Sequence, residues 1–270
     1  MSTHSDVGLR LDPLSLMLSQ RELNIEYTPL CSFFVDDYLP PAIYEELYSS
    51  YPDVHAGEYA TNDEGKFGFR SSEVADAFER FCDQWPVWRD LVDFFASDAF
   101  AADTQAALDR GLVDARGTAG RKPWLNYTDR AASNNPLRYW RSEPMKTTFQ
   151  ISVLPPGKVV QPHRDAPRKL VSLMLYFADP DWRDEWGGST EFYEALDPER
   201  ASEWAATERV PFDALKPVRS VAFRPNRLAG FVRSDTSWHG VDPIRCPEGY
   251  GRKALLVNLK RLKWNKRHEP

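Results

Sequence analysis

The stretch KTTFQISVLPPGKVVQPHRDAPRKLVSLMLYF, which runs from Lys146 to Phe177, decides the fold class of this chain. It contains two runs rich in β-branched and other apolar residues, Thr147 to Leu154 and Leu170 to Phe177. Between them lie the turn residues Pro155-Pro156-Gly157 and a polar segment with the tripeptide His163-Arg164-Asp165. Short runs of this kind, bounded by Pro and Gly, predict β-strands. We therefore predict two strands joined by a polar connection that carries a histidine and an aspartate.

Successive side chains of a strand point to opposite faces, so each predicted strand can be sorted into two faces. In the first run, one face carries Thr148, Gln150 and Ser152, and the other carries Phe149, Ile151 and Val153. In the second run, Ser172, Met174 and Tyr176 lie opposite Val171, Leu173, Leu175 and Phe177. The apolar faces are predicted to pack on a core. The mixed faces fit a polar cavity and a solvated surface equally well.

The same pattern continues toward the C-terminus. The turn residues Gly187-Gly188 and Pro225-Asn226 separate further β-rich runs, which are Thr190 to Tyr193, Ser220 to Phe223, Leu228 to Val232 and Ala254 to Leu259. Six or more short strands without long helices between them indicate an antiparallel sandwich or barrel, and the jelly roll is one common form. We therefore predict a β-rich core over residues 146–262.

The sequence before this core has a different character. The segment Pro40 to Tyr51 begins with prolines and has apolar residues at helical spacing, and Phe78 to Leu112 is also predicted to be helical. The segments Arg116 to Pro123 and Asn126 to Pro136 are rich in Gly, Asn, Asp and Pro, which predicts loops. We expect residues 1–145 to form a helical and loop-rich region that packs on the core, and residues 263–270 to form a basic tail.

Composition narrows the class of protein. The chain has 270 residues, 42% of them hydrophobic and 13% aromatic, which is typical of a packed globular protein and not of a disordered one. The formal net charge of -6 argues against nucleic acid as a partner, because phosphate binding favours a basic face. The basic residues from Lys260 to Arg267 are the contrary signal, and we interpret them as a solvated end.

The cysteines and the apolar segments indicate the cellular compartment in which the protein is expected. The three cysteines, Cys31, Cys82 and Cys246, are too few and too scattered for a disulfide framework or a thiolate zinc site. The N-terminus has no basic stretch followed by an apolar run, and no later segment has about 18 consecutive apolar residues. We therefore expect a cytoplasmic protein without a membrane partner. The sequence predicts no particular oligomeric state.

Three residues have the chemistry of a metal site. His163 and Asp165 are two positions apart, so both side chains are expected on the same side of the chain, and His239 follows the predicted strand Leu228 to Val232. Two imidazoles and one carboxylate can occupy one face of an octahedral Fe(II) and leave three positions open. We therefore predict an iron site made of His163, Asp165 and His239.

A histidine two positions before an acidic residue is weak evidence by itself. With 40 acidic residues among 270, the five histidines give roughly 0.7 such matches by chance. His4-Ser5-Asp6 is a second match, and we interpret it as accidental because it lies at the terminus. His163 differs from His4 in its context, with a strand and turn before it and a strand after it. His55 and His268 have no comparable context.

At these residues the sequence resembles the Fe(II)/2-oxoglutarate-dependent oxygenases, especially bacterial members related to prolyl hydroxylases. The resemblance covers about Lys146 to Leu259. Its motifs are, in order, Pro162-His163-Arg164-Asp165, Gly187-Gly188-Ser189-Thr190-Glu191-Phe192, Pro225-Asn226-Arg227-Leu228, Ser237-Trp238-His239-Gly240-Val241 and Arg252-Lys253-Ala254-Leu255. It implies a mainly β fold with flanking helices, built on a double-stranded β-helix (jelly roll, cupin-like) core. Iron and 2-oxoglutarate are expected at the wider end of that core.

The resemblance also implies roles for individual residues. His163, Asp165 and His239 would be catalytic iron ligands, with 2-oxoglutarate as co-substrate, O2 as oxidant and ascorbate as an optional addition. Arg252 matches the basic residue that anchors the distal carboxylate of 2-oxoglutarate, although the segment Cys246 to Gly251 makes its distance from His239 longer than in close relatives. Lys253 is the alternative anchor. Tyr176 matches a position where some relatives place a hydroxyl on the same carboxylate, and a simple core tyrosine is the alternative.

The implied activity is that of an Fe(II)/2-oxoglutarate-dependent dioxygenase that hydroxylates a small molecule, such as an amino acid, a sugar or a natural-product intermediate. Because halogenating relatives lack the carboxylate ligand, the presence of Asp165 favours oxygen insertion. The alternatives are a prolyl-type hydroxylase of protein side chains, another metal enzyme on the same fold, and a non-catalytic cupin-like binding module. Substrate determinants are expected in the N-terminal region and in the loop from Ala178 to Trp186, where Trp182 and Trp186 could cover the site or pack.

Overall fold

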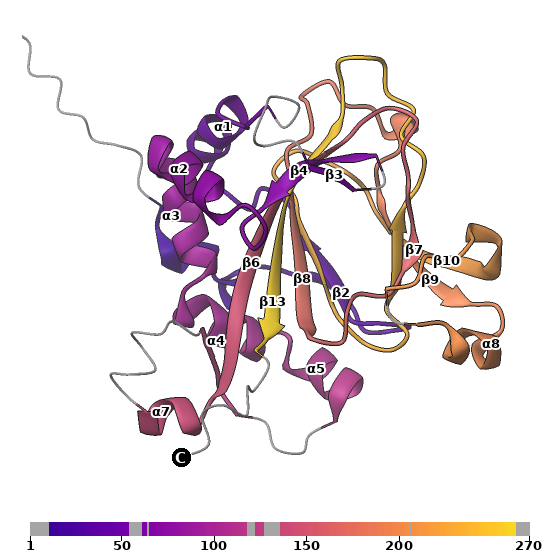
Figure 1. Cartoon of the computed structure of the whole chain (residues 1–270), viewed down its shortest axis with the longest axis horizontal. Coiled ribbons are helices and arrows are strands. Elements are labelled where there is room, and N and C mark those ends of the chain that lie inside the picture. The colour runs from indigo at the N-terminus through magenta and orange to yellow at the C-terminus, as the bar shows by residue number, and fades with distance from the viewer. Residues whose placement is uncertain are drawn as a thin grey trace, which may run out of the picture.

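Two β-sheets face each other, and most of the helices gather on the outer side of the larger sheet (Figure 1). This computed structural model describes residues 11–53, 61–63, 65–117, 122–126, 136–205 and 207–262. The arrangement is the predicted mainly β fold with flanking helices, and its core is the double-stranded β-helix. The predicted basic tail, residues 263–270, lies outside the described residues.

The larger sheet contains nine strands in the described part of the chain, and its neighbours are antiparallel except for β5, which runs parallel to β6. In spatial order the antiparallel strands are β1 (Asn24–Glu26), β2 (Ser32–Val35), β11 (Leu228–Val232), β8 (Lys169–Tyr176), β13 (Arg252–Arg261), β6 (Glu143–Leu154), β4 (Lys66–Arg70) and β3 (Thr61–Asp63), and β5 spans Trp124–Asn126. The predicted strands within 146–177 correspond to β6 and β8 and are confirmed.

The smaller sheet has four antiparallel strands. They are, in spatial order, β10 (Leu215–Val221), β9 (Thr190–Ala195), β12 (Trp238–Val241) and β7 (Val160–His163). Strands β7 and β12 were not predicted from the sequence, because each has four residues and neither shows a long apolar run. These two strands carry the predicted metal-binding histidines.

The helices lie mainly before the core in sequence, as predicted. They are α1 (Pro41–Ser49), α2 (Ala75–Gln84), α3 (Pro86–Phe95), α4 (Asp98–Ala107), α5 (Asp109–Arg116), α7 (Pro136–Trp140) and α8 (Pro198–Glu203). Proline begins α1 and α3, where its fixed φ suits the first helical turn, and the Ser97 hydroxyl accepts a hydrogen bond from the Phe100 amide at the start of α4. In the described part of the chain, none of the helices has the length and apolar character needed to cross a bilayer.

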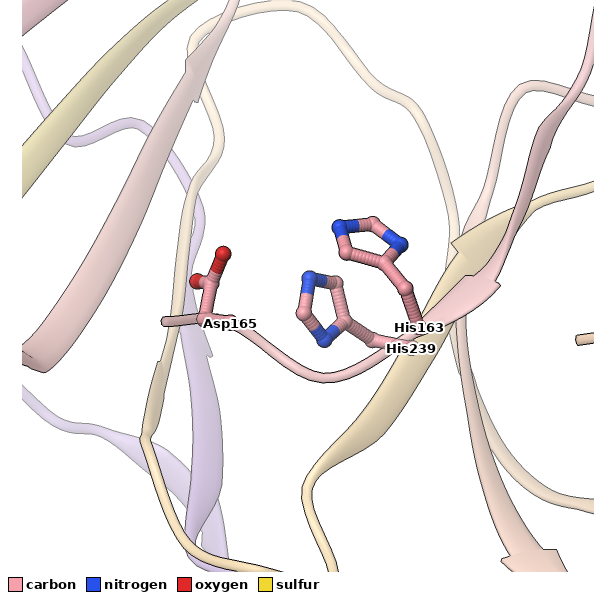
Figure 2. Close-up of side chains that lie close together, drawn as sticks. All are labelled: His163, Asp165 and His239. Atoms are coloured by element: carbon pink, nitrogen blue, oxygen red, sulfur yellow. The ribbon is translucent and has the colours of Figure 1, made fainter. Parts of the chain in front are cut away.

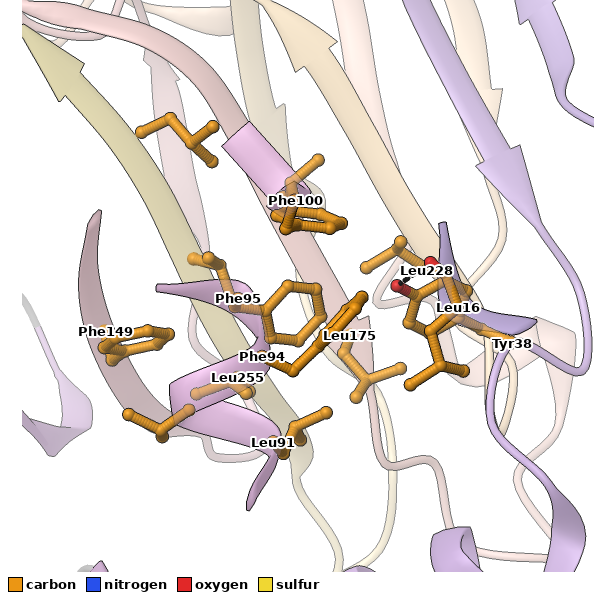
Figure 3. Packing of buried hydrophobic residues seen from close by; sticks show 14 of the residues in the cluster. Leu16, Tyr38, Leu91, Phe94, Phe95, Phe100, Phe149, Leu175, Leu228 and Leu255 are labelled. Atoms are coloured by element: carbon orange, nitrogen blue, oxygen red, sulfur yellow. Dashed lines mark hydrogen bonds between the residues drawn. The ribbon is translucent and has the colours of Figure 1, made fainter. Parts of the chain in front are cut away.

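The main hydrophobic core lies between these helices and the larger sheet. The apolar face of β6, with Phe149, Ile151 and Val153, and the apolar face of β8 both contribute to it. From the helical side Phe94, Phe95 and Phe100 pack together, and Figure 3 shows them beside Leu175 and Leu255 of the sheet. Burial of apolar surface here, at roughly 25 cal/mol per Å², fixes the N-terminal helices against the β core.

The N-terminal region also contributes strands, which were not predicted from its sequence. Strand β2 pairs with β11, and β4 pairs with β6, so the region extends the larger sheet at both sides. Because Phe67 and Phe69 of β4 join the main core, strand alternation turns Lys66 and Arg70 to the opposite, inner face. The N-terminal region therefore forms part of the wall around the space between the sheets.

Candidate active site

The pairing of β12 with β7 brings His239 opposite His163. The two residues are partners in the strand register, and their ring centroids are 4.4 Å apart. Asp165 projects to the same side as His163, whereas Arg164 between them turns away and lies over the ring of Trp238. Figure 2 shows the Asp165 carboxylate facing the two imidazoles. The potential ligand atoms of the three residues all lie within 4.8 Å of one another.

A backbone carbonyl orients each histidine ring. The Nδ1 atom of His163 is 2.9 Å from the Gln161 oxygen, and that of His239 is 3.0 Å from the Ser237 oxygen. Because a carbonyl only accepts, Nδ1 carries the proton of the neutral ring, and Nε2 keeps a lone pair for a metal. Burial lowers the pKa of both rings and outweighs the opposing effect of the Asp165 carboxylate. Both histidines therefore have the neutral form that metal binding requires.

The Asp165 carboxylate is held on both of its oxygens. The Lys169 ammonium lies 2.5 Å from Oδ1, and the Ser172 hydroxyl donates to Oδ2 at 2.6 Å. Burial by itself would raise the pKa of Asp165, but the charge of Lys169 and these two hydrogen bonds outweigh it, so the pKa is lowered. The carboxylate is therefore ionised at neutral pH.

The donor set fits a divalent iron ion. Two neutral imidazole nitrogens and one ionised carboxylate are the ligand types of a facial site that leaves open positions for other ligands. The three donors are close enough for small side-chain adjustments to bring them to one ion. Among the described residues, no other group of three His, Cys, Asp or Glu side chains is placed to do so.

The three side chains face a cavity of about 250 Å³ between the two sheets. The larger sheet lines it with residues that include Gln150, Ser152, Ser172 and Met174, and the smaller sheet contributes Thr190 and Val241. The mixed faces of the two predicted strands therefore line a cavity, which decides between the two interpretations that the sequence allowed.

Arg252, the first residue of β13, lies at one end of the same cavity. It is buried, with Nε donating to the Gly188 carbonyl at 2.6 Å and Nη2 donating to the Thr190 hydroxyl at 3.0 Å. Its guanidinium carbon lies 4.8 Å from the centroid of the Tyr176 ring. Burial lowers the pKa of Arg252, but an arginine stays protonated at neutral pH. The cavity therefore ends in a fixed positive charge.

Tyr176 and Lys253 lie differently from Arg252. Tyr176 is fully buried with its hydroxyl 2.6 Å from that of Thr190, so its side chain packs behind Arg252 and outside the set of cavity-lining residues. Lys253 points to the other face of the sheet, where its ammonium lies 3.0 Å from the Asp179 carboxylate. Strand alternation therefore separates the two cations.

Comparison with protein families identifies the segment that carries these residues. Residues 149–260, which include all three metal-site residues and Arg252, match the family model of the 2OG-Fe(II) oxygenase superfamily. The segment is a 2OG-Fe(II) oxygenase domain. This superfamily uses Fe(II), 2-oxoglutarate and O2, so the segment carries an Fe(II)- and 2-oxoglutarate-dependent dioxygenase domain. Comparison with curated protein sequences gives no match.

Solved structures resemble the oxygenase in fold. A prolyl 4-hydroxylase from Phytophthora capsici superposes with a TM-score of 0.53 at 15% identity, over 94% of this chain and 67% of the other. A Pseudomonas putida prolyl-4-hydroxylase gives a TM-score of 0.46 at 15% identity, over 93% of this chain and 100% of the other. At this identity the first likeness establishes the fold, which extends beyond the 149–260 segment into the N-terminal region.

Several residues around the oxygenase site were not predicted. Asp165 is held by Lys169 and Ser172, and Arg252 is held by Thr190. In the sequence these three are ordinary strand residues, and only strand pairing shows what they contact. Trp182 and Trp186 pack against each other with ring centroids 5.5 Å apart and do not line the cavity. His4, His55 and His268 lie outside the described residues.

Proposed function

We propose that this oxygenase hydroxylates a small molecule, with His163, Asp165 and His239 as its iron ligands and Arg252 as the anchor of 2-oxoglutarate. One observation carries the proposal: the three ligand side chains and a buried arginine face one cavity between the sheets. In the overall reaction, substrate C–H, O2 and 2-oxoglutarate become C–OH, succinate and CO2. One oxygen atom enters succinate and the other enters the alcohol, so the two oxidations balance the reduction of O2.

The chain's own residues prepare the metal site. The Gln161 and Ser237 carbonyls keep both Nε2 lone pairs directed at the cavity, and Lys169 and Ser172 keep the Asp165 carboxylate ionised. When bound, the iron supplies O2 activation and a coordination site for the keto acid. Because three protein ligands leave three positions of an octahedron open, the triad can accommodate both reactants together.

Arg252 is suited to the distal carboxylate of the co-substrate. A guanidinium offers paired donors that match a carboxylate, and burial strengthens this interaction by removing competing water. The bonds to Gly188 and Thr190 fix the direction of the guanidinium before the co-substrate arrives. Tyr176 supports Arg252 from behind, and its hydroxyl can act on the same carboxylate through Thr190, which lines the cavity.

The size of the cavity favours a small substrate. At about 250 Å³ it is smaller than the roughly 300–1,000 Å³ of typical ligand pockets, and it must also hold the co-substrate. An amino acid, a sugar or a natural-product intermediate would fit this description better than a folded protein. A prolyl-type hydroxylase of protein side chains is the competing proposal, because a single side chain could also enter.

A succinate-release screen tests the proposal. The protein would be supplied with Fe(II), 2-oxoglutarate and O2, first alone and then with a small-molecule library or with proline-containing peptides. We expect slow succinate formation by the protein alone and a marked increase with one class of small molecules. If only the peptides stimulate the reaction, the small-molecule proposal is wrong, and if no succinate forms under any condition, the oxygenase proposal fails.

A further inference from the structure

The cavity lining has an excess of positive charge. In the described part of the chain, Asp165 is the single carboxylate among the lining residues, whereas the cations are Lys66, Arg70, Lys169, Arg209 and Arg252. Iron would offset the charge of Asp165, and 2-oxoglutarate would offset that of Arg252. The remaining cations then face the space left for the primary substrate.

Three cations lie on the inner face of the larger sheet, at positions away from Arg252. Lys260 is the strand partner of Lys169, at a register shift in the pairing of β13 with β8. The pairing of β13 with β6 is unbroken from Arg252 to Arg261, so alternation along β13 places Lys260 on the inner face with Arg252, eight residues earlier. At about 3.3 Å per residue, the two positions are about 26 Å apart. Arg70 of β4 lies on the same inner face, opposite Gln150 of β6. We refer to these three residues as the cationic end: Arg70 and Lys169 line the cavity, and Lys260 neighbours Lys169 without lining it.

Electrostatics supports this grouping. The pKa of Lys260 is lowered by burial first and then by the charges of Lys169, Arg168 and Arg70, with Asp165 acting in the opposite direction. Like charges held near one another in a partly buried place repel, and an anionic group between them would relieve that repulsion. Two carboxylates already lie nearby: Glu73 pairs with Arg70 at 2.7 Å, and Asp165 pairs with Lys169 at 2.5 Å.

The metal-site residues lie beside the cationic end, on the side toward Arg252, because Lys169 bonds to Asp165. Ser172, which binds the Asp165 carboxylate, is the strand partner of Asn258, and Asn258 is located between Arg252 and Lys260 on β13. A molecule held by the cationic end can therefore extend a carbon toward the triad without competing for Arg252. Two separate anion-binding ends around one reactive centre would distinguish the substrate from the co-substrate.

We propose that the primary substrate is a small acid whose carboxylate or phosphate group is bound by Arg70, Lys169 and Lys260. The proposal rests on the proposed function for the reaction that follows, but anion binding can be measured without turnover. It excludes cationic substrates such as basic amino acids, because the cationic end would repel them. The N-terminal region takes part in recognition through Arg70.

Titration calorimetry measures the binding of anions to the cationic end directly. Full-length protein would be loaded with Mn(II), which replaces Fe(II) without turnover, and saturated with 2-oxoglutarate so that Arg252 is occupied. Inorganic phosphate and benzoate serve as the probes, and the tighter of the two identifies the preferred anionic group. We expect saturable binding that weakens as ionic strength rises, because partly exposed charges are screened by salt.

Variants locate the bound anion. Arg70→Gln and Lys260→Gln should each raise the dissociation constant of the tighter probe by about tenfold or more, since each removes a charged donor. Arg110→Gln is a matched control because Arg110 also pairs with an acidic residue, Asp114, on the surface. Lys216→Gln is the lysine control, on an exposed position of β10. The unfolding midpoint of every variant reports whether it is folded.

The outcomes are distinct. Absence of saturable probe binding to the wild-type protein, or affinity unchanged in both Arg70→Gln and Lys260→Gln, would overturn the proposal. A second test compares N-acetyl amino acids with their primary amides in the succinate assay, and equal or better stimulation by the amides would also count against it. If the wild-type protein binds the probes but forms no succinate, the proposed function fails and the anion-binding end stands.

Discussion

The Lys169 ammonium lies 2.5 Å from Oδ1 of Asp165, so a lysine is bonded to the carboxylate that we propose as an iron ligand. Both side chains are mostly buried, with 22% and 7% of their surfaces exposed. In the metal-free protein this lysine supplies the positive charge that a buried carboxylate requires. An iron ion at the triad would supply a second positive charge to the same group.

This relationship predicts that Lys169→Met destabilises the metal-free protein more than the metal-loaded protein. Without the ammonium, the buried carboxylate keeps Ser172 as its partner, and the free energy of unfolding should fall by about 1–3 kcal/mol at pH 7. Metal bound to Asp165 should recover part of that loss. Urea unfolding with and without Mn(II) measures both values, and an equal loss in the two states would contradict the prediction.

Alanine at His163, Asp165 or His239 should abolish succinate formation and weaken iron binding, because each change removes one of three protein ligands. His4→Ala is the control, since it removes a histidine of the same sequence pattern that we do not assign to the site. Iron titration and the succinate assay should be applied to all four variants. Full activity in His239→Ala would disprove the triad.

Arg252→Ala should raise the 2-oxoglutarate concentration needed for half-maximal activity, by a penalty of about 2–4 kcal/mol, because a buried carboxylate would lose its charged partner. Iron affinity should change little. Lys253→Ala is the matched control, since Lys253 bonds to Asp179 on the other face of the same strand. The reverse pattern, with the larger effect in Lys253→Ala, would show that the anchor is misassigned.

The metal-free protein should lose stability as the pH falls from about 7 to 5. Burial lowers the pKa of His163 and His239 in the folded state, so below their ordinary pKa of 6.5 the unfolded chain binds protons that the folded protein does not. The loss should be about 1–2 kcal/mol per histidine. Thermal unfolding across this range checks it, and the double variant His163→Gln/His239→Gln should show a weaker pH dependence.

Turnover in concentrated chloride should give an alcohol and not a chlorinated product, because Asp165 occupies the position that a halide would need. Under labelled O2, one label atom should enter succinate and a second should enter the alcohol. Mass spectrometry of the product tests this once a substrate is found. A product lighter by two hydrogens would indicate desaturation or ring closure instead.

The sequence by itself determined the architecture of the core and the candidates for its chemistry. Alternating apolar residues in β6 and β8 predicted the strands and their buried faces, because alternation is a local property of a strand. The order of His163, Asp165 and His239 among turn motifs predicted the metal site. The resemblance to the oxygenase family singled out Arg252, with Lys253 as the alternative.

Tertiary structure decided which residues surround those candidates, because strand pairing between distant segments is not encoded in any local pattern. The register of β12 with β7 placed His239 beside His163, and the register of β13 with β8 placed Lys260 beside Lys169. The N-terminal region, predicted as helix and loop, contributed β4 and with it Arg70 to the cavity wall. A charged residue on a short strand looks like a solvated surface residue in sequence, and only the facing sheet encloses it and makes it part of a binding site.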